Sequence, residues 1–476
     1  MRVERQPWRG KKGSEMSRRG LLPLLCVVLL WGTIPASTTA AVETAEYAAR
    51  RAKVMAAIGD GIAIVLGAAT PANDVAFDQG NDFAYLTGLQ APDATLVIDG
   101  QRKESILFLT LDEKTADGMG LPLDLARNPA AYTGIERVMP ADGLAGFLGG
   151  LYRRDPTLYT PFRPEEIGPE NSTEKFNALQ RSMTLNPWDG RLTRELQFVT
   201  RLRERFPNYE TRDLAPIIWD LRKYKSTGEL ALMRASAQLG VEGHRALMRS
   251  TRPGVAERSL AAVFDFVTAL GGARGVAYYT IIMSGKNHAY GHYHAYDRVL
   301  EDGDFLILDA GPSLGNYHVD ISTSFPASGR FSPRQRELYE AALVIRNAAI
   351  AAYRPGITLR DVGQKMHEAL IANKLERFAA DFASIIRYGG YNHSIGMATH
   401  DVMGTFAGPD EVLKPGFVFA CDIQIYRVNE QMGVRIEDTV AITETGREVL
   451  SEGAPRTVAD IEALMKEPGI LQGIRR

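Results

Sequence analysis

Acidic residues stand inside or at the end of apolar, strand-like segments in the second half of this 476-residue chain. Asp309 ends the run FLIL, and Asp320 lies in a stretch that alternates apolar and polar residues. Asp422 interrupts FVFACDIQIY, and Glu437 interrupts GVRIEDTVAI. An ionised carboxylate in an apolar segment is costly unless it is paired or coordinated. The pattern therefore raises two alternatives: a shared charged site, or unrelated turn-capping and solvent-facing carboxylates.

Histidine usage favours the shared site. All eight histidines lie between His244 and His400, and His393 stands in the motif NHSIG. Buried carboxylates that share a site repel one another and stay protonated unless cations neutralise them. Four carboxylates and one imidazole form an oxygen-rich ligand set that suits divalent Mn, Zn or Co. Two such cations side by side can activate a water molecule and polarise a carbonyl group.

The elements that must position these residues follow from periodicity. Capping motifs predict helices that begin at Ser226, Ser332 and Thr358. Period-2 or continuous apolar segments predict strands at 280–283, 305–309, 319–325, 416–426 and 433–442. The sequence therefore predicts an α+β domain over 215–460, in which long helices cover one face of an antiparallel sheet.

A smaller α/β domain is expected over 41–206, ahead of a boundary at 206–214, where Pro207, Asn208 and the nearby Pro216 interrupt the pattern. We expect a helix at 41–55, strands at 62–66, 94–98 and 106–109, a surface loop at 117–137 and a final helix at 192–205. The motif NDFAYLTG lies between the first two strands.

Residues 1–40 are typical of a signal peptide. Basic residues precede the apolar run Leu21–Trp31, which is short for a membrane span, and small residues follow near Ala40. The pair Arg18-Arg19 also resembles a twin-arginine export signal. We expect an exported protein, periplasmic or secreted, whose mature form has no integral membrane span. The alternative is an uncleaved membrane anchor.

Composition limits the other possibilities. The chain is 45% hydrophobic and 24% charged, with a formal net charge of −2, which is typical of a soluble globular protein and gives no electrostatic basis for binding nucleic acid. Its two cysteines are Cys26 and Cys421. Cleavage near Ala40 would leave Cys421 alone, so no intramolecular disulfide is expected.

Several of these motifs, in order and at matching spacing, resemble one metallopeptidase family. LILDAG with VDISTSF, NHSIG with HD, and VRIEDT are similar to the metal-site motifs of aminopeptidase P, prolidase, methionine aminopeptidase and creatinase. NDFAYLTG resembles the N-terminal domain found in aminopeptidase P. The resemblance implies a C-terminal domain with the pita-bread fold, preceded by a smaller α/β domain.

The same resemblance implies roles for individual residues. It implies five metal ligands, of which Asp320 and Glu437 bridge two ions: Asp309, Asp320, His393, Asp422 and Glu437. It also implies three catalytic residues. His292 would line the substrate site, with His288 and His294 as alternatives in register, His400 would hydrogen-bond the substrate or tetrahedral intermediate, and Arg435 would lie near the site.

This chain departs from the family at one ligand. The family usually has Glu at the position of Asp422, commonly within Val-Glu-Pro-Gly, whereas this chain has Cys421-Asp422-Ile423-Gln424. Asp is one methylene shorter than Glu.

By this resemblance we expect an aminopeptidase that uses two divalent metal ions. Mn is the expected metal, and Zn and Co are the alternatives. It would release the N-terminal residue from peptides with proline in the second position, and it would form a homo-oligomer. Three alternatives remain: an Xaa-Pro dipeptidase (prolidase), a hydrolase of this fold with a non-proline substrate, and a non-catalytic binding protein.

Overall fold

The computed structural model describes residues 42–71, 77–152, 154–164, 173–188, 190–402 and 408–473. The predicted signal peptide lies outside these residues. Among the described helices, none is both long and apolar enough to cross a membrane.

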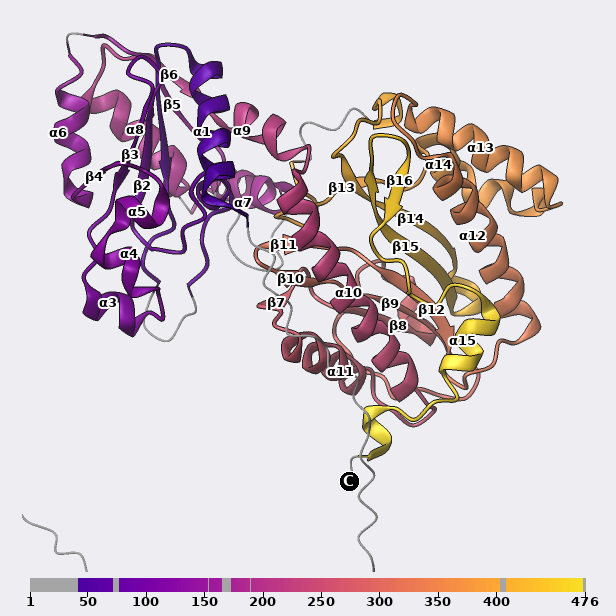
Figure 1. The fold of residues 1–476 in the computed structure, drawn as a ribbon. Coiled ribbons are helices and arrows are strands. Elements are labelled where there is room, and N and C mark those ends of the chain that lie inside the picture. Colours follow the sequence, from indigo (N-terminus) through magenta and orange to yellow (C-terminus); the bar gives the residue numbers. More distant parts are fainter. Residues whose placement is uncertain are drawn as a thin grey trace, which may run out of the picture. The chain divides into compact units, whose positions relative to one another are not determined.

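The N-terminal part is built on a six-stranded mixed sheet with the order β4-β3-β2-β1-β5-β6. Its strands are β1 (Ile62–Leu66), β2 (Thr95–Asp99), β3 (Glu104–Phe108), β4 (Arg137–Met139), β5 (Leu158–Thr160) and β6 (Thr211–Asp213). Helices α1 (Thr44–Ile58), α2 (Asn81–Thr87), α6 (Leu144–Gly149) and α8 (Arg194–Arg205) lie beside the sheet (Figure 1), and α7 (Thr173–Leu185) follows β5 in the chain. NDFAYLTG forms α2, which ends at Gly88 in the left-handed conformation.

The expected surface loop at 117–137 is wrong in detail. Three short helices occupy most of it: α3 (Glu113–Gly118), α4 (Leu123–Arg127) and α5 (Pro129–Thr133). Side chains at Asp112 and Asn128 cap α3 and α5, and Pro129 stands at the first position of α5. Each of these helices is too short to show the periodicity on which a sequence-based prediction depends.

The C-terminal part contains an antiparallel sheet with the order β13-β14-β15-β12-β9-β8, to which β16 (Arg447–Val449) adds beside β15. The strands are β8 (Ile281–Ser284), β9 (Phe305–Asp309), β12 (Ser322–Pro326), β13 (His393–Ser394), β14 (Val418–Arg427) and β15 (Met432–Ile442). A second, three-stranded sheet contains β7 (Gly275–Val276), β10 (Pro312–Leu314) and β11 (Tyr317–His318).

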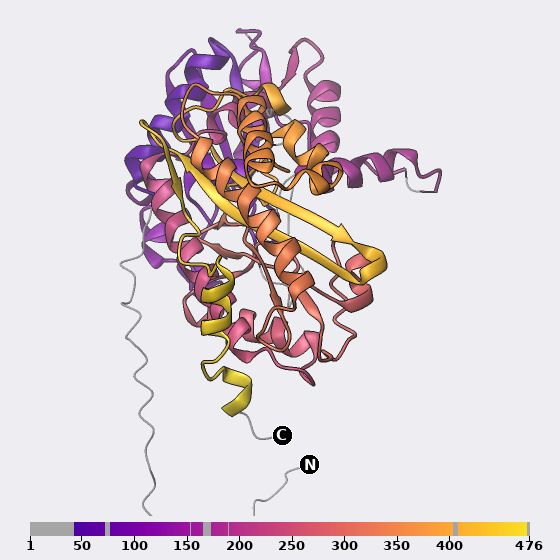
Figure 2. The same ribbon diagram turned by 90° about the vertical axis from the view of Figure 1, so that its right-hand side faces the viewer.

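Long helices accompany the large sheet: α10 (Thr227–Ser250), α11 (Glu257–Leu270), α12 (Pro333–Ala352), α13 (Leu359–Ala372) and α14 (Ala379–Tyr388). α9 (Ala215–Arg222) precedes them and α15 (Val458–Leu464) follows. Both α12 and α14 pack against β14, and Figure 2 shows α12 (orange) crossing the long yellow strands. The predicted helix starts at Ser226, Ser332 and Thr358 are confirmed, each with a reciprocal capping box.

Alternation along the strands separates an apolar face from a polar one. Phe419, Cys421 and Ile423 of β14, and Val434 and Ile436 of β15, belong to the main hydrophobic core with the helices. Asp422, Gln424, Arg435 and Glu437 occupy the intervening positions and therefore face away from that core.

The expected strand at 319–325 is shorter in the structure. β12 begins at Ser322, and 319–321 lie outside any strand. At Asp320 a side chain replaces the strand ladder: Thr439 Oγ1 accepts from Asp320 N at 2.9 Å and donates to Asp320 O at 2.8 Å. This arrangement turns Asp320 out of the regular pleat.

Candidate metal centre

Four acidic or hydroxyl side chains form one row across four neighbouring strands. Asp309 of β9 pairs with Ser322 of β12, Ser322 pairs with Glu437 of β15, and Glu437 pairs with Asp422 of β14. Directly paired residues on adjacent antiparallel strands project from the same face. The strand register alone therefore brings together three of the predicted carboxylates: Asp309, Asp422 and Glu437. Asp309 and Glu437 are 128 positions apart in the sequence.

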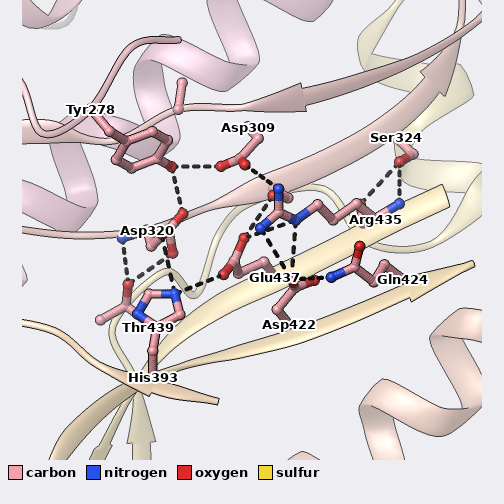
Figure 3. Close-up of polar contacts among 12 residues, drawn as sticks. Tyr278, Asp309, Asp320, Ser324, His393, Asp422, Gln424, Arg435, Glu437 and Thr439 are labelled. Carbon is pink, nitrogen blue, oxygen red and sulfur yellow. Dashed lines mark hydrogen bonds and ion pairs between the residues drawn. The ribbon is translucent and has the colours of Figure 1, made fainter. Parts of the chain in front are cut away.

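His393 and Asp320 complete the cluster from outside that row. His393 Nε2 lies 3.5 Å from Asp320 Oδ2 and 3.6 Å from Glu437 Oε1. Asp320, His393 and Glu437 can each offer one ligand atom within 4.8 Å of the others (Figure 3). All five predicted ligand residues are buried: Asp309 is 2%, Asp320 3%, Asp422 2%, His393 8% and Glu437 0% exposed.

Arg435 lies among the carboxylates. Its Nη1 atom is 2.6 Å from Asp309 Oδ2, and its Nε atom is 3.2 Å from Asp422 Oδ2 and 3.5 Å from Glu437 Oε2 (Figure 3). The side chain is 8% exposed. A buried guanidinium that faces three carboxylates offsets part of their mutual repulsion.

The pKa values of the buried aspartates show that Arg435 offsets only part of the negative charge of the site. Burial, then repulsion from Glu437 and Asp309, raises the pKa of Asp320 well above its usual value. Burial also raises the pKa of Asp422, and attraction to Arg435 opposes this shift. At Glu437 burial raises the pKa as well, but Arg435 and the neighbouring His393 outweigh it, so the pKa falls to about 2.

Two oxygen atoms in the cluster indicate that these residues fit a divalent cation. Asp422 Oδ1 and Glu437 Oε1 are buried, and neither accepts a hydrogen bond from the described part of the chain. A buried carboxylate oxygen without a partner is costly, and a cation would compensate it. Carboxylate oxygens with a single imidazole form a donor set that suits Mn and related ions.

Comparison with known proteins agrees with this centre. Residues 231–444 match the model of metallopeptidase family M24, and residues 47–159 match that of the aminopeptidase P N-terminal domain. The C-terminal part of this chain belongs to metallopeptidase family M24. As an M24 enzyme it is a hydrolase that acts on peptide bonds.

Relatives of this M24 protein include Xaa-Pro aminopeptidase of Escherichia coli, which is 27% identical over 88% of this chain and 97% of the relative. Xaa-Pro dipeptidase of Pongo abelii is 26% identical over 82% of this chain and 85% of the relative. Among solved structures, aminopeptidase PepP of Pseudomonas aeruginosa has a TM-score of 0.71 at 29% identity and covers 90% of this chain and 99% of its own.

A putative aminopeptidase P from Bacillus anthracis has a TM-score of 0.75 at 25% identity, over 90% of this chain and 100% of its own. The predicted family, and the pita-bread domain preceded by an aminopeptidase P-type domain, are therefore confirmed.

Of the other histidines predicted for the site, only some lie beside the centre in the structure. The His400 ring centroid lies 4.1 Å from that of His393, so His400 adjoins the M24 centre. His292 is exposed, in the segment after the turn of 3₁₀ helix η2 (Gly285–Ala289), and its carbonyl oxygen lies 3.0 Å from His294 Nδ1. His288 is buried, and its Nε2 lies 2.9 Å from Phe305 O, on the backbone of β9.

Sequence reasoning missed several side chains that support the M24 centre. The Tyr278 hydroxyl lies within hydrogen-bond distance of both Asp309 Oδ1 (2.6 Å) and Asp320 Oδ1, and Ser322 Oγ donates to Glu437 Oε2 at 2.8 Å. Gln424 Nε2 donates to Asp422 Oδ2 at 2.7 Å. Strand parity could have identified Ser322 and Gln424, because both occupy the polar face.

The motif NDFAYLTG also contacts the segment that carries the histidines. Asn81 Nδ2 donates to Met397 O at 2.9 Å. Asp82 Oδ1 accepts from Arg222 Nη1 at 2.8 Å, and the same guanidinium pairs with buried Asp401. These contacts hold the chain at Met397 and at Asp401, on either side of His400, so residues of α2 and α9 help to position that histidine.

Proposed function

We propose that this M24 hydrolase is an Xaa-Pro aminopeptidase that holds two divalent cations. Mn is the first candidate for these cations. The proposed ligands are Asp309, Asp320, His393, Asp422 and Glu437. The observation that carries the proposal is the buried row of carboxylates that Asp320 and His393 complete. The names of relatives such as the Escherichia coli and Haemophilus influenzae Xaa-Pro aminopeptidases support the substrate class.

The substrate bond explains what the chain's residues must do. An Xaa-Pro bond is a tertiary amide without an N–H group, and its nitrogen must gain a proton before it can leave. When bound, the cations supply an activated water molecule and polarise the scissile carbonyl.

The protein's own groups then handle the proton and the developing charge. Asp422 is buried in the row beside the cations, so its carboxylate is suited to take a proton from the attacking water and deliver it to the proline nitrogen. His400, next to His393, donates a hydrogen bond to the carbonyl oxygen as negative charge develops.

A peptide panel tests the proposal. Purified protein loaded with Mn should release the first residue of an Xaa-Pro-Xaa tripeptide and leave an Xaa-Ala-Xaa control intact, and EDTA should stop the release. Cleavage of Xaa-Pro dipeptides alone would identify an Xaa-Pro dipeptidase, as the relatives with that name make plausible. Full turnover in EDTA, or metal binding without any cleavage, would reject the proposal.

Export and self-association complete the proposal. The basic and apolar pattern of residues 1–40 supports export by a cleaved signal. Cell fractionation with N-terminal sequencing of the mature protein tests this, and a chain that keeps residues 1–40 would contradict it. A homo-oligomer is expected by analogy with the family, and light scattering of the purified protein measures its mass.

A further inference from the structure

The two carboxylate oxygens of Asp422 have unequal surroundings. Oδ2 accepts from Gln424 Nε2 at 2.7 Å and from Arg435 Nε at 3.2 Å, and Arg435 Nη2 lies 3.1 Å away. Oδ1 is buried and accepts no hydrogen bond from any residue the structure describes. Figure 3 shows the Gln424 amide and the Arg435 guanidinium converging on the same carboxylate. The donors therefore hold one oxygen and leave the other for a ligand.

Strand geometry fixes where Gln424 acts. Gln424 follows Asp422 by two residues on β14, so both side chains project from the polar face, and it pairs directly with Arg435 on β15. Asp422 in turn pairs with Glu437. Gln424 and Arg435 thus form the next row of the sheet, immediately beside the row of carboxylates.

We infer that Gln424 is a positioning residue that fixes the orientation of Asp422 so that Oδ1 faces the metal centre. The inference rests on the proposed metal site. Partners outside the ligand shell orient the ligands, and their loss costs about 10- to 100-fold in metal affinity. Arg435 also serves Asp309 and Glu437, whereas the one side-chain hydrogen bond that Gln424 makes in the described structure is to Asp422.

The pairing also gives a physical reason for the lengths of the two side chains. Asp422 is shorter than Glu by one methylene group, and the long Gln424 side chain approaches its carboxylate from the same strand face. A Glu at 422 would carry its carboxylate into the space that the Gln424 amide occupies. Residues 422 and 424 therefore act as a matched pair, a short acid with a long amide.

Calorimetric titration of metal-stripped protein with MnCl₂ tests the inference without measuring turnover. Gln424→Met keeps the side-chain length but removes the donor, and it should weaken Mn binding by about 10- to 100-fold at one of the sites. Gln364→Met, an exposed glutamine on α13, is the matched control and should bind Mn like the wild type. If Gln424→Met does not fold by circular dichroism, Gln424→Leu applies the same test, because it also removes the donor and adds no metal ligand.

A double-mutant cycle separates positioning from general structural support. Asp422→Glu alone should weaken Mn binding, and adding Gln424→Gly should restore it, because the longer acid then has room. Wild-type affinity in Gln424→Met, or purely additive losses in the cycle, would overturn the inference and leave the proposed function intact. A wild-type protein that binds no Mn would overturn both.

Discussion

Arg435 Nη1 lies 2.6 Å from Asp309 Oδ2, although the two residues belong to β15 and β9, which are separated by β12 in the sheet. The arginine thus reaches across a strand to the first carboxylate of the row, while its Nε contacts Asp422. Its charge and the charge of a bound cation compensate the same carboxylates. The stability of the protein should therefore depend on Arg435 and on metal together.

Arg435→Met should destabilise the metal-free protein by about 3–5 kcal/mol, because it leaves buried carboxylates without a compensating charge. Added Mn should recover much of this loss, since the cations take over the compensation. Urea unfolding in EDTA and in excess Mn measures both effects. Arg334→Met is the control, because Arg334 and its partner Glu430 are both solvent-exposed. It should lower the free energy of unfolding by under about 1 kcal/mol. An equal loss with and without Mn would contradict the prediction.

Tyr278→Phe should lower metal affinity while the fold remains. The phenol oxygen lies between Asp309 and Asp320 and orients both carboxylates, and loss of such a partner costs about 10- to 100-fold in affinity. Competition with a chelator of known affinity measures the change. Tyr388→Phe, at a more exposed tyrosine on α14, serves as the control. Unchanged affinity in Tyr278→Phe would show that Asp309 and Asp320 are oriented without it.

His244 should make folding stability sensitive to acid. The ring is fully buried, with Nδ1 2.9 Å from Thr323 Oγ1 and Nε2 2.9 Å from Ala310 O, and burial lowers its pKa to about 4. In the unfolded chain a histidine titrates near 6.5, so between these values the unfolded state binds a proton that the folded state does not. Stability should fall as the pH drops through this window, by about 3 kcal/mol in total.

His244→Gln should remove this component of the acid sensitivity. The stability difference between wild type and variant should be larger at pH 7.5 than at pH 4.5, as measured by urea unfolding at each pH. His367→Gln, at an exposed position on α13, is the matched control. A stability difference that does not change with pH would mean that His244 does not supply the effect.

Asn81→Ala should reduce turnover more than metal content. The substitution leaves the Met397 carbonyl without its amide donor, which costs about 1–3 kcal/mol and loosens the segment that carries His400. His393 is held independently, because β13 pairs with β14. Steady-state kinetics with an Xaa-Pro peptide, together with metal analysis, separates the two effects. Asn373→Ala, which removes an exposed amide–carbonyl bond on α13, should change neither quantity.

Much of this site follows from local sequence pattern. Apolar neighbours at 421 and 423, and at 436, fixed the strand faces of Asp422 and Glu437, and the spacing of Arg435 from Glu437 placed both on one face. The end of the strand at Asp320 could not be predicted in this way. The Thr439 hydroxyl that replaces its ladder bonds lies 119 positions away in sequence. The contact of Tyr278 with two carboxylates likewise depends on a tertiary approach that no local pattern encodes.

The order of strands has a consequence for how the enzyme is made. Glu437 enters the row of carboxylates through β15, close to the C-terminal end of the chain, and Asp309 enters through β9. A ribosome must therefore synthesise the chain from β9 through β15 before the set of metal ligands is complete. Any nascent chain that terminates before β15 lacks Glu437, so its set of metal ligands is incomplete. Premature termination should therefore yield products that cannot retain the metal.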